Sequence, residues 1–139
     1  MKEHVVKKSF LLVSLILFLS WLTACGGGGP STSLNVIMTD FHYSPDSFTV
    51  PAGQEITINA TNNGAVVHEF VIMKYGTKVT KDFTAEDKKN VYWMVELQPG
   101  GQTNTKFTAP SEPGEYQIVC GTPGHFISGM VGKLTVVAQ

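Results

Sequence analysis

The sequence of 139 residues contains no arginine and no excess of basic side chains. Its lysines are slightly outnumbered by acidic residues, for a formal net charge of −1 at pH 7. Proteins that bind nucleic acids need a basic surface that neutralises phosphates. This charge balance therefore argues against a nucleic-acid partner, and by itself it selects no other partner.

Cysteine is also scarce, since Cys25 and Cys120 are the two in the chain. Exported domains of this size are often held together by paired cysteines. Because Cys25 is expected to carry lipid, Cys120 is left without a partner. We therefore expect no disulfide bond within the domain.

Sequence motifs of enzymes are missing as well. There is no G-x-S-x-G segment, and in HEFVI the residue Ile72 stands where a zinc protease of the H-E-x-x-H type needs its second histidine. We therefore expect a protein that is not an enzyme.

The chain begins with an export signal. Lys2, Lys7 and Lys8 precede an apolar run over 10–22, which is shorter than the roughly 20 residues of a transmembrane helix. The run ends in Leu22-Thr23-Ala24-Cys25, which resembles the lipobox of bacterial lipoprotein signal peptides. That resemblance implies cleavage before Cys25 and acylation of Cys25.

This interpretation divides the chain into three segments. Residues 1–24 are the signal peptide, residues 25–33 are the lipidated cysteine with a Gly/Ser-rich tether, and residues 34–139 are one folded domain. We expect the protein to be exported and held by its lipid on the outer face of the cytoplasmic membrane, or in the periplasm or outer membrane.

The domain has the pattern of an all-β protein. Short β-branched and aromatic runs alternate with turn residues at intervals of about ten, as in a sandwich or barrel. In segment 54–59, Ile56 and Ile58 share one face of a half-buried strand. Thr84 with Asp87 predicts one short, polar surface helix. The expected strands are 34–40, 47–50, 54–59, 66–73, 91–97, 102–108, 114–120 and 130–137.

The segment CGTPGHFISGM, residues 120–130, brings together three side chains that bind soft metals. Cys120 is expected to end one strand and Met130 to begin the next, with His125 directly after the reversal at Pro123-Gly124. His68, on an expected core strand, adds a second imidazole from a distant part of the sequence. The three side chains of this loop and His68 of the distant strand thus form a set of four potential metal ligands.

These ligand types select the metal. Two imidazoles and a thiolate with a weak axial methionine form the type 1 copper arrangement. Methionine is a poor zinc ligand, and a structural zinc site needs four good donors. Iron–sulfur clusters need four thiolates, and c-type haem needs a C-x-x-C-H run. The sequence therefore predicts one copper ion held by His68, Cys120, His125 and Met130.

His68 followed by YQIVCGTPGHFISGM, with its C-x4-H-x4-M spacing, resembles the cupredoxins, the blue copper proteins, and among them carriers of the sulfocyanin and auracyanin type. The segments FHYSPDSFTVPAG, PGGQTNTKFTAPSEPGEY and GMVGKLTVV extend the resemblance over most of the domain. It implies a Greek-key β-sandwich of about eight strands with copper near one end, bound by His68, Cys120 and His125, with Met130 axial.

Glu69 departs from this resemblance. Many cupredoxins have asparagine directly after the first histidine ligand, where it ties the two ligand loops together. Glu69 takes that position here. We therefore expect a different hydrogen-bond arrangement around the ligands, with no ligand lost.

Phe126 and Ile127 directly follow His125 in the sequence. We expect them to lie around the edge of its imidazole, joined by Ala65 and Val66 from the His68 side. Such an apolar patch suits the brief docking of a redox partner. The alternative is that these side chains only cap the end of the sandwich.

Three functions fit these features. The leading hypothesis is a monomeric, membrane-tethered carrier of single electrons, whose partners are membrane or periplasmic redox proteins. The second is a lipoprotein for copper binding, delivery or tolerance, which Glu69 and the lack of a strong docking signature keep open. The third is a cupredoxin subunit of a larger oxidoreductase complex. A four-ligand site leaves no open position for substrate, unlike catalytic metal sites.

Overall fold

The computed structural model describes residues 29–139. The expected signal peptide, Cys25 and the first residues of the tether lie outside the described residues. Within residues 29–139, no helix combines the length and the apolar character that crossing a membrane requires.

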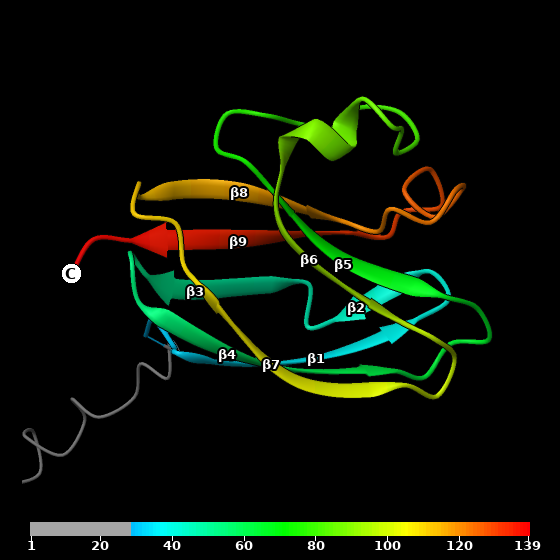
Figure 1. Ribbon diagram of the computed structural model, residues 1–139, viewed down its shortest axis with the longest axis horizontal. Coiled ribbons are helices and arrows are strands. Elements are labelled where there is room, and N and C mark those ends of the chain that lie inside the picture. The colour runs from blue at the N-terminus through cyan, green and yellow to red at the C-terminus, as the bar shows by residue number, and fades with distance from the viewer. Residues whose placement is uncertain (1–28) are drawn as a thin grey trace, which may run out of the picture.

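Two β-sheets pack face to face (Figure 1). The first has the order β2-β1-β4-β7, and the second has the order β3-β9-β8-β5-β6. The pairs β1/β4 and β3/β9 are parallel, and the other pairs are antiparallel. This arrangement confirms the predicted all-β sandwich. The strands are β1 (Ser33–Thr39), β2 (His42–Ser44), β3 (Ser47–Pro51), β4 (Glu55–Asn62), β5 (His68–Met73), β6 (Val91–Leu97), β7 (Gln102–Thr108), β8 (Gly114–Val119) and β9 (Val131–Val137).

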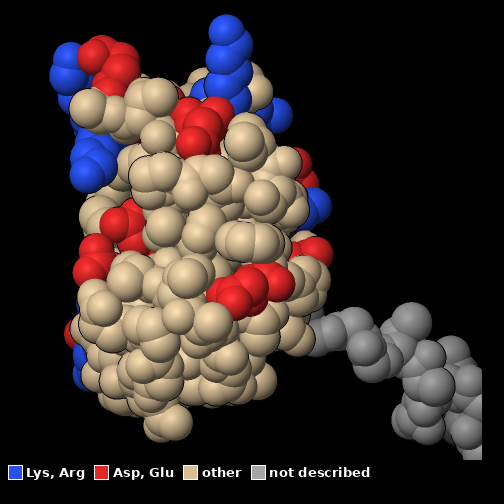
Figure 2. Space-filling model, turned by 90° about the vertical axis from the view of Figure 1, so that its right-hand side faces the viewer, with Lys and Arg blue, Asp and Glu red and all other residues tan. Residues whose placement is uncertain are grey.

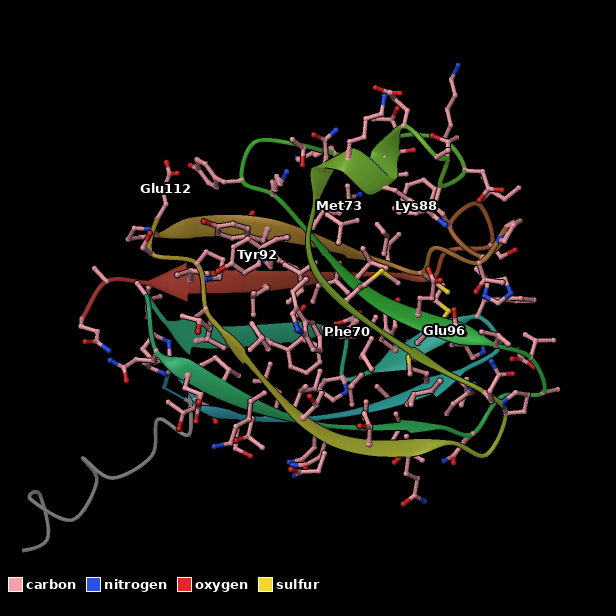
Figure 3. All side chains as sticks on the ribbon, in the orientation of Figure 1. Phe70, Met73, Lys88, Tyr92, Glu96 and Glu112 are labelled. Carbon is pink, nitrogen blue, oxygen red and sulfur yellow. The ribbon has the colours of Figure 1, made fainter. Side chains whose placement is uncertain are left out.

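The core lies between the two sheets because apolar side chains alternate along most strands. In β4, Ile56 and Ile58 are fully buried, while Thr57 between them is not. Phe70 of β5 lies near the middle of the sandwich, where Tyr43 and Phe48 each meet its ring edge to face (Figure 3). The predicted alternation of β4 is thus confirmed.

The strand β2 is absent from the sequence-based prediction. It has only three residues and is followed by Pro45, so it offers no alternating run that a pattern search can find. Its middle residue, Tyr43, is buried, which brings the sequence segment after β1 into the core.

The connection between β5 and β6, residues 74–90, covers the outer face of the second sheet. Val79 and Phe83 are buried there against Val71 of β5 and Val119 of β8. The expected helical turn exists as a short 3-10 helix, η1 (Asp87–Asn90), and Asp87 exchanges hydrogen bonds with Thr84. Because of this cover, β5 is buried on both faces.

Candidate metal centre

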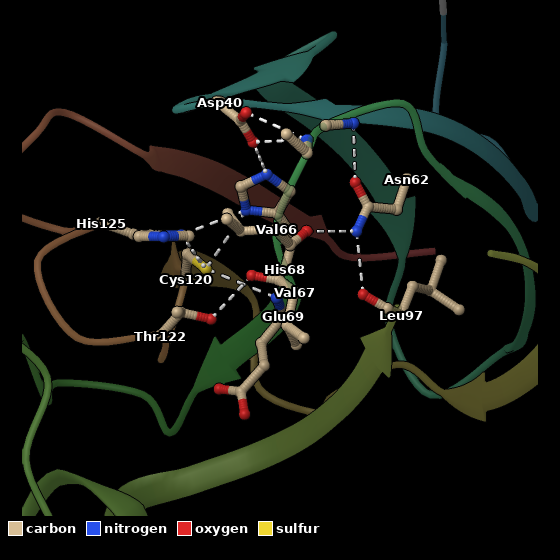
Figure 4. Close-up of polar contacts among 12 residues, drawn as sticks. Asp40, Asn62, Val66, Val67, His68, Glu69, Leu97, Cys120, Thr122 and His125 are labelled. Carbon is tan, nitrogen blue, oxygen red and sulfur yellow. Dashed lines mark hydrogen bonds and ion pairs between the residues drawn. The ribbon is translucent and has the colours of Figure 1, made fainter. Parts of the chain in front are cut away.

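Three of the four expected ligands meet at one end of the sandwich. His68 begins β5, Cys120 directly follows β8, and His125 lies in the loop between β8 and β9 (Figure 4). Their donor atoms lie within 4.8 Å of one another. His68 Nδ1 lies 3.1 Å from His125 Nδ1 and 4.0 Å from Cys120 Sγ, and His125 Nδ1 lies 3.3 Å from Cys120 Sγ.

This triangle fits a metal ion. With bonds of about 2.0 Å to nitrogen and about 2.3 Å to sulfur, three donors in one plane lie about 3.5–3.7 Å apart, and the observed separations bracket that spacing. Two imidazoles with one thiolate are the in-plane set of a type 1 copper centre. Copper is accordingly the metal that fits these residues.

The donors are enclosed. His68 and Cys120 are 0% exposed and His125 is 5% exposed. Met130 is also fully buried, within the same core cluster as Cys120. Cys120 is a free thiol among residues 29–139.

Backbone bonds close the loop that carries Cys120, His125 and Met130. Met130 N–H donates to His125 O at 3.0 Å, and Cys120 N–H donates to Met130 O at 3.3 Å. Gly124 has φ of 82°, a left-handed conformation that suits glycine at the expected reversal. The two ends of the loop are therefore fixed to each other beside the ligand histidine.

Asn62 holds the segment before His68. Its side chain is fully buried and donates to Val66 O at 2.8 Å and to Leu97 O at 2.9 Å, while it accepts from Gly64 N–H at 2.8 Å (Figure 4). All of these bonds fix the backbone that leads into β5. In the sequence, Asn62 is recognisable only as part of a turn signal, because its bond to Leu97 O joins residues that are 35 positions apart.

The turn between β1 and β2 touches both imidazoles. Asp40 Oδ1 lies 2.7 Å from His68 Nε2. The ring of Phe41 meets the ring of His125 edge to face, with 4.7 Å between their centroids. The hydrogen bond from Ala65 N–H, followed by the interaction with His68, lowers the pKa of Asp40. Phe41 begins the segment FHYSPDSFTVPAG of the resemblance, but nothing in the sequence assigns Asp40 or Phe41 to the metal centre, since both lie far from the ligands along the chain.

His125 is in an environment that favours the neutral ring. Burial, followed by the proximity of His68, lowers the pKa of His125 below its usual value. A neutral imidazole is the form that binds metals.

The backbone of Glu69, and not its side chain, reaches the sulfur. Glu69 N–H donates to Cys120 Sγ at 3.4 Å. The side chain points away from the three donors (Figure 4) and lines a surface hollow of about 420 Å³. Burial, followed by the carboxylate of Glu96, raises the pKa of Glu69.

Thr122 joins the two ligand segments instead. Its hydroxyl donates to Val67 O at 3.1 Å, so the loop after Cys120 is bonded to the residue before His68. This is the connection that the resemblance assigned to an asparagine at position 69. The altered hydrogen-bond arrangement expected from Glu69 is therefore compensated by a hydroxyl on the other loop.

Two further side chains support the loops from outside. Tyr43 of β2 donates its hydroxyl to Glu69 O at 2.6 Å, directly behind the first histidine. Asp82, in the 74–90 connection, accepts from Gly124 N–H at 2.8 Å, next to the second histidine. These two bonds join residues that are 26 and 42 positions apart in the sequence, so neither role could be assigned from the sequence.

The surface around His125 is partly apolar. Val66 and Phe41 are each 42% exposed and Ile127 is 69% exposed. Phe126 turns the other way and packs against the buried cluster beneath the 74–90 connection. Figure 2 views the molecule from this end, where uncharged surface dominates and lysines lie mainly along the upper edge. Phe41 belongs to this apolar surface, although no sequence pattern indicates it.

Known proteins share this architecture and sequence pattern. The chain is 31% identical over 114 residues to the copper-resistant cuproprotein CopI of Rubrivivax gelatinosus, covering 75% of this chain and 66% of that protein. It is 29% identical over 144 residues to auracyanin-A of Chloroflexus aurantiacus, covering 83% of this chain and 88% of that protein.

Solved structures of auracyanins are also similar to this chain. A reduced auracyanin of Roseiflexus castenholzii is 33% identical, with a TM-score of 0.66, over 78% of this chain and 99% of the other. The blue copper protein auracyanin A of Chloroflexus aurantiacus is 27% identical, with a TM-score of 0.62, over 78% of this chain and 100% of the other. Residues 10–136 match the cupredoxin-like domain, and the chain belongs to that family.

Proposed function

We propose that the protein is a type 1 copper protein that carries single electrons, and that His68, Cys120, His125 and Met130 would hold the copper ion. The observation that carries this proposal is the buried triangle of two Nδ1 atoms and one Sγ, held by hydrogen bonds from three separate segments. Bound copper supplies the one-electron couple between Cu(II) and Cu(I).

The frame around the ligands suits this chemistry because it limits their movement. His68 is fixed by Asp40, Cys120 Sγ receives the Glu69 N–H, and the loop of His125 is held by Asp82 through Gly124. Ligands that keep one arrangement serve both oxidation states with little rearrangement. The enclosed apolar surroundings and the hydrogen bond to sulfur set the potential of such a site.

His125 is the proposed exit for the electron. It is the more exposed of the two imidazoles, and Phe41, Val66 and Ile127 are exposed near it. An apolar surface of this kind permits brief contact with a partner, because few charged groups must lose their water. We propose membrane or periplasmic redox proteins as the partners, and no enzymatic activity for the protein itself.

The proposed location is outside the cytoplasmic membrane. Cleavage before Cys25 and acylation of that residue would leave residues 25–33 as the lipidated tether and residues 34–139 as the domain. In the described chain, β1 begins at Ser33, at the end of the sandwich opposite to the metal centre (Figure 1). A tether at that end leaves His125 facing away from the lipid.

A redox titration tests this function. The copper-loaded protein should take up one electron per copper, and its visible colour should bleach on reduction and return on oxidation over many cycles. Copper should stay bound to the protein in both states when a chelator is present. Loss of copper at each reduction would contradict the proposal.

A copper-handling protein is the second candidate, because a relative at 31% identity is described as a copper-resistant cuproprotein. Such a protein would exchange its ion rapidly with a chelator or with a second copper protein. An electron carrier keeps its ion and passes only the electron. The rate of copper exchange, measured with an isotope of copper, therefore separates the two functions.

A further inference from the structure

We propose that Asp40 is a positioning residue of the metal centre, which orients His68 and holds the proton of that ring on Nε2, and whose negative charge stabilises oxidised copper over reduced copper. The second part rests on the proposed redox function. The first part concerns the chain alone and holds whether or not the protein carries electrons.

The contact between Asp40 and His68 defines the donor. A carboxylate can only accept a hydrogen bond, so the 2.7 Å separation from Asp40 Oδ1 requires that His68 Nε2 carries the hydrogen. In a neutral ring the other nitrogen, Nδ1, is then bare. That nitrogen is the atom directed at Cys120 and His125.

Asp40 is itself held in place. Its Oδ2 accepts from Ala65 N–H at 3.0 Å, three residues before His68. Oδ1 also accepts from Ala65 N–H at 3.2 Å, so the carboxylate binds the backbone of the ligand segment with both oxygens and the ligand ring with Oδ1. His68 is fully buried, whereas the side chain of Asp40 is 32% exposed, so Asp40 connects the buried ring to the surface.

Gly64 leaves the space in which Asp40 and His68 meet. A Cβ at Gly64 would collide with Asp40 Oδ1 and would lie 2.5 Å from His68 Nε2. Gly64 does not have the positive φ that would otherwise explain a glycine. Its lack of a side chain is therefore used for the close approach of the carboxylate to the ring.

The charge acts on the metal through His68. A carboxylate that accepts the second ring N–H raises the basicity of the ligating nitrogen. A more basic ligand and a nearby negative charge both favour the more positive ion. The Asp40 carboxylate should therefore give the copper site a lower reduction potential than an uncharged acceptor at the same place would give.

The first test uses metal-free protein with ¹⁵N-labelled histidine. In the wild type, the Nε2–H proton of His68 should resonate far downfield and exchange slowly with water, because a carboxylate accepts it. In Asp40→Ala this signal should move upfield or be lost through exchange. An unchanged signal would overturn the positioning role, and this measurement does not depend on copper.

The second test compares Asp40→Asn with Glu55→Gln in the copper-loaded protein. The amide oxygen of the first variant can still accept from His68 Nε2 and from Ala65 N–H, as Asp40 Oδ1 does, but it carries no charge, so this variant isolates the effect of the charge. The ratio of Cu(II) to Cu(I) affinity should fall by about tenfold, which raises the one-electron potential by about 59 mV. Glu55 is paired with Lys106 at the start of β4, seven residues from the metal end of that strand, and its variant makes the same change in net charge.

The variant Gly64→Ala disturbs the contact between Asp40 and His68 without changing either residue. It keeps Asp40 but separates it from His68, so it should also raise the potential and shift the His68 Nε2–H signal. If Asp40→Asn shifts the potential no more than Glu55→Gln does, the electrostatic role is wrong. If the wild type forms no coloured copper site, the proposed function fails, while the metal-free measurement still decides the role of Asp40.

Discussion

At the scale of single residues, burial of polar groups is concentrated at the metal centre. In residues 29–139 the buried polar or charged side chains are Asn62, His68 and His125, and all three belong to the site. Burying a polar group costs free energy unless it is hydrogen-bonded. The domain accepts this cost where it holds the metal and has an apolar core elsewhere.

The variant Met130→Leu tests whether Met130 is a copper ligand. In Met130→Leu the volume of the side chain is kept, so the free energy of unfolding should fall by less than about 1.5 kcal/mol. The reduction potential of the loaded protein should rise, because a weak donor to Cu(II) is lost. The matched variant Met73→Leu alters a buried methionine of the second core cluster and should leave the potential unchanged. Equal potentials in both variants would exclude Met130 as a ligand.

Asn62 tests the support of the first histidine. Asn62→Ala leaves Gly64 N–H and two carbonyls without their partner, so unfolding should become easier by about 2–4 kcal/mol. Copper should also dissociate faster. The neighbouring Asn63 is exposed, and Asn63→Ala should change neither quantity appreciably. Thermal unfolding and chelator-induced copper release measure the two effects, and similar values for the two variants would contradict the assigned role.

The ligand residues could be predicted from the sequence because their chemical types are rare and their spacing is specific. Cys120, His125 and Met130 lie in one loop, and His68 was the remaining histidine on an apolar strand. Asp40 and Phe41 could not be predicted. Aspartate and phenylalanine occur everywhere in proteins, and only folding brings these two beside the imidazoles.

At the scale of elements, the short strand β2 supports the metal centre from the core side. It places Tyr43 against β5, where the ring contacts Phe70 and the hydroxyl donates a hydrogen bond to Glu69 O. The backbone at Glu69 donates in turn to Cys120 Sγ. A strand of three residues thus contributes to the position of the sulfur.

Tyr43→Phe isolates this contribution. It removes one hydrogen bond and keeps the ring, so the loss in stability should be about 1 kcal/mol. Tyr116→Phe is a matched control, because Tyr116 also donates to a glutamate carbonyl, Glu112 O, at the end of the molecule away from the metal (Figure 3). We expect similar losses of stability in both variants, with a shifted visible absorption band only in Tyr43→Phe. A band shift of the same size in Tyr116→Phe would show that the effect is not local.

Several strands were predictable because their apolar residues alternate between turns, as in β1 and β4. The connection 74–90 was predictable only in part. Its lysines and acids indicated solvent exposure, and its helical turn was expected. Its buried inner face was not predicted, because Val79 and Phe83 are single apolar residues among polar ones. The bond from Gly124 N–H to Asp82 was not predicted either, because it joins residues 42 positions apart.

At the scale of the whole molecule, the two ends of the sandwich differ. One end carries the metal centre with exposed apolar side chains, and the other carries the start of β1 and the C-terminus (Figure 1). An anchor before β1 would therefore present the metal end to other proteins. This polarity supports the proposed tethered carrier.

The apolar end should control electron exchange between two copies of the protein. Ile127→Lys places like charges in the contact, so the rate of electron self-exchange should fall by more than about tenfold at low ionic strength, with partial recovery in salt. Ile37→Lys makes the same change on the outer face of β1 and should leave the rate nearly unchanged. NMR line broadening in mixtures of oxidised and reduced protein measures both rates. Equal rates in the wild type and Ile127→Lys would exclude this face as the contact.

The central claim is that His68, Cys120 and His125 hold copper through a thiolate bond. The visible spectrum of the oxidised, copper-loaded protein tests it most directly, compared with that of Cys120→Ser at equal copper content and with an intact fold by circular dichroism. We predict an intense visible band in the wild type that disappears on reduction and is absent from Cys120→Ser. A colourless oxidised wild type, or an unchanged band in Cys120→Ser, would contradict the assignment.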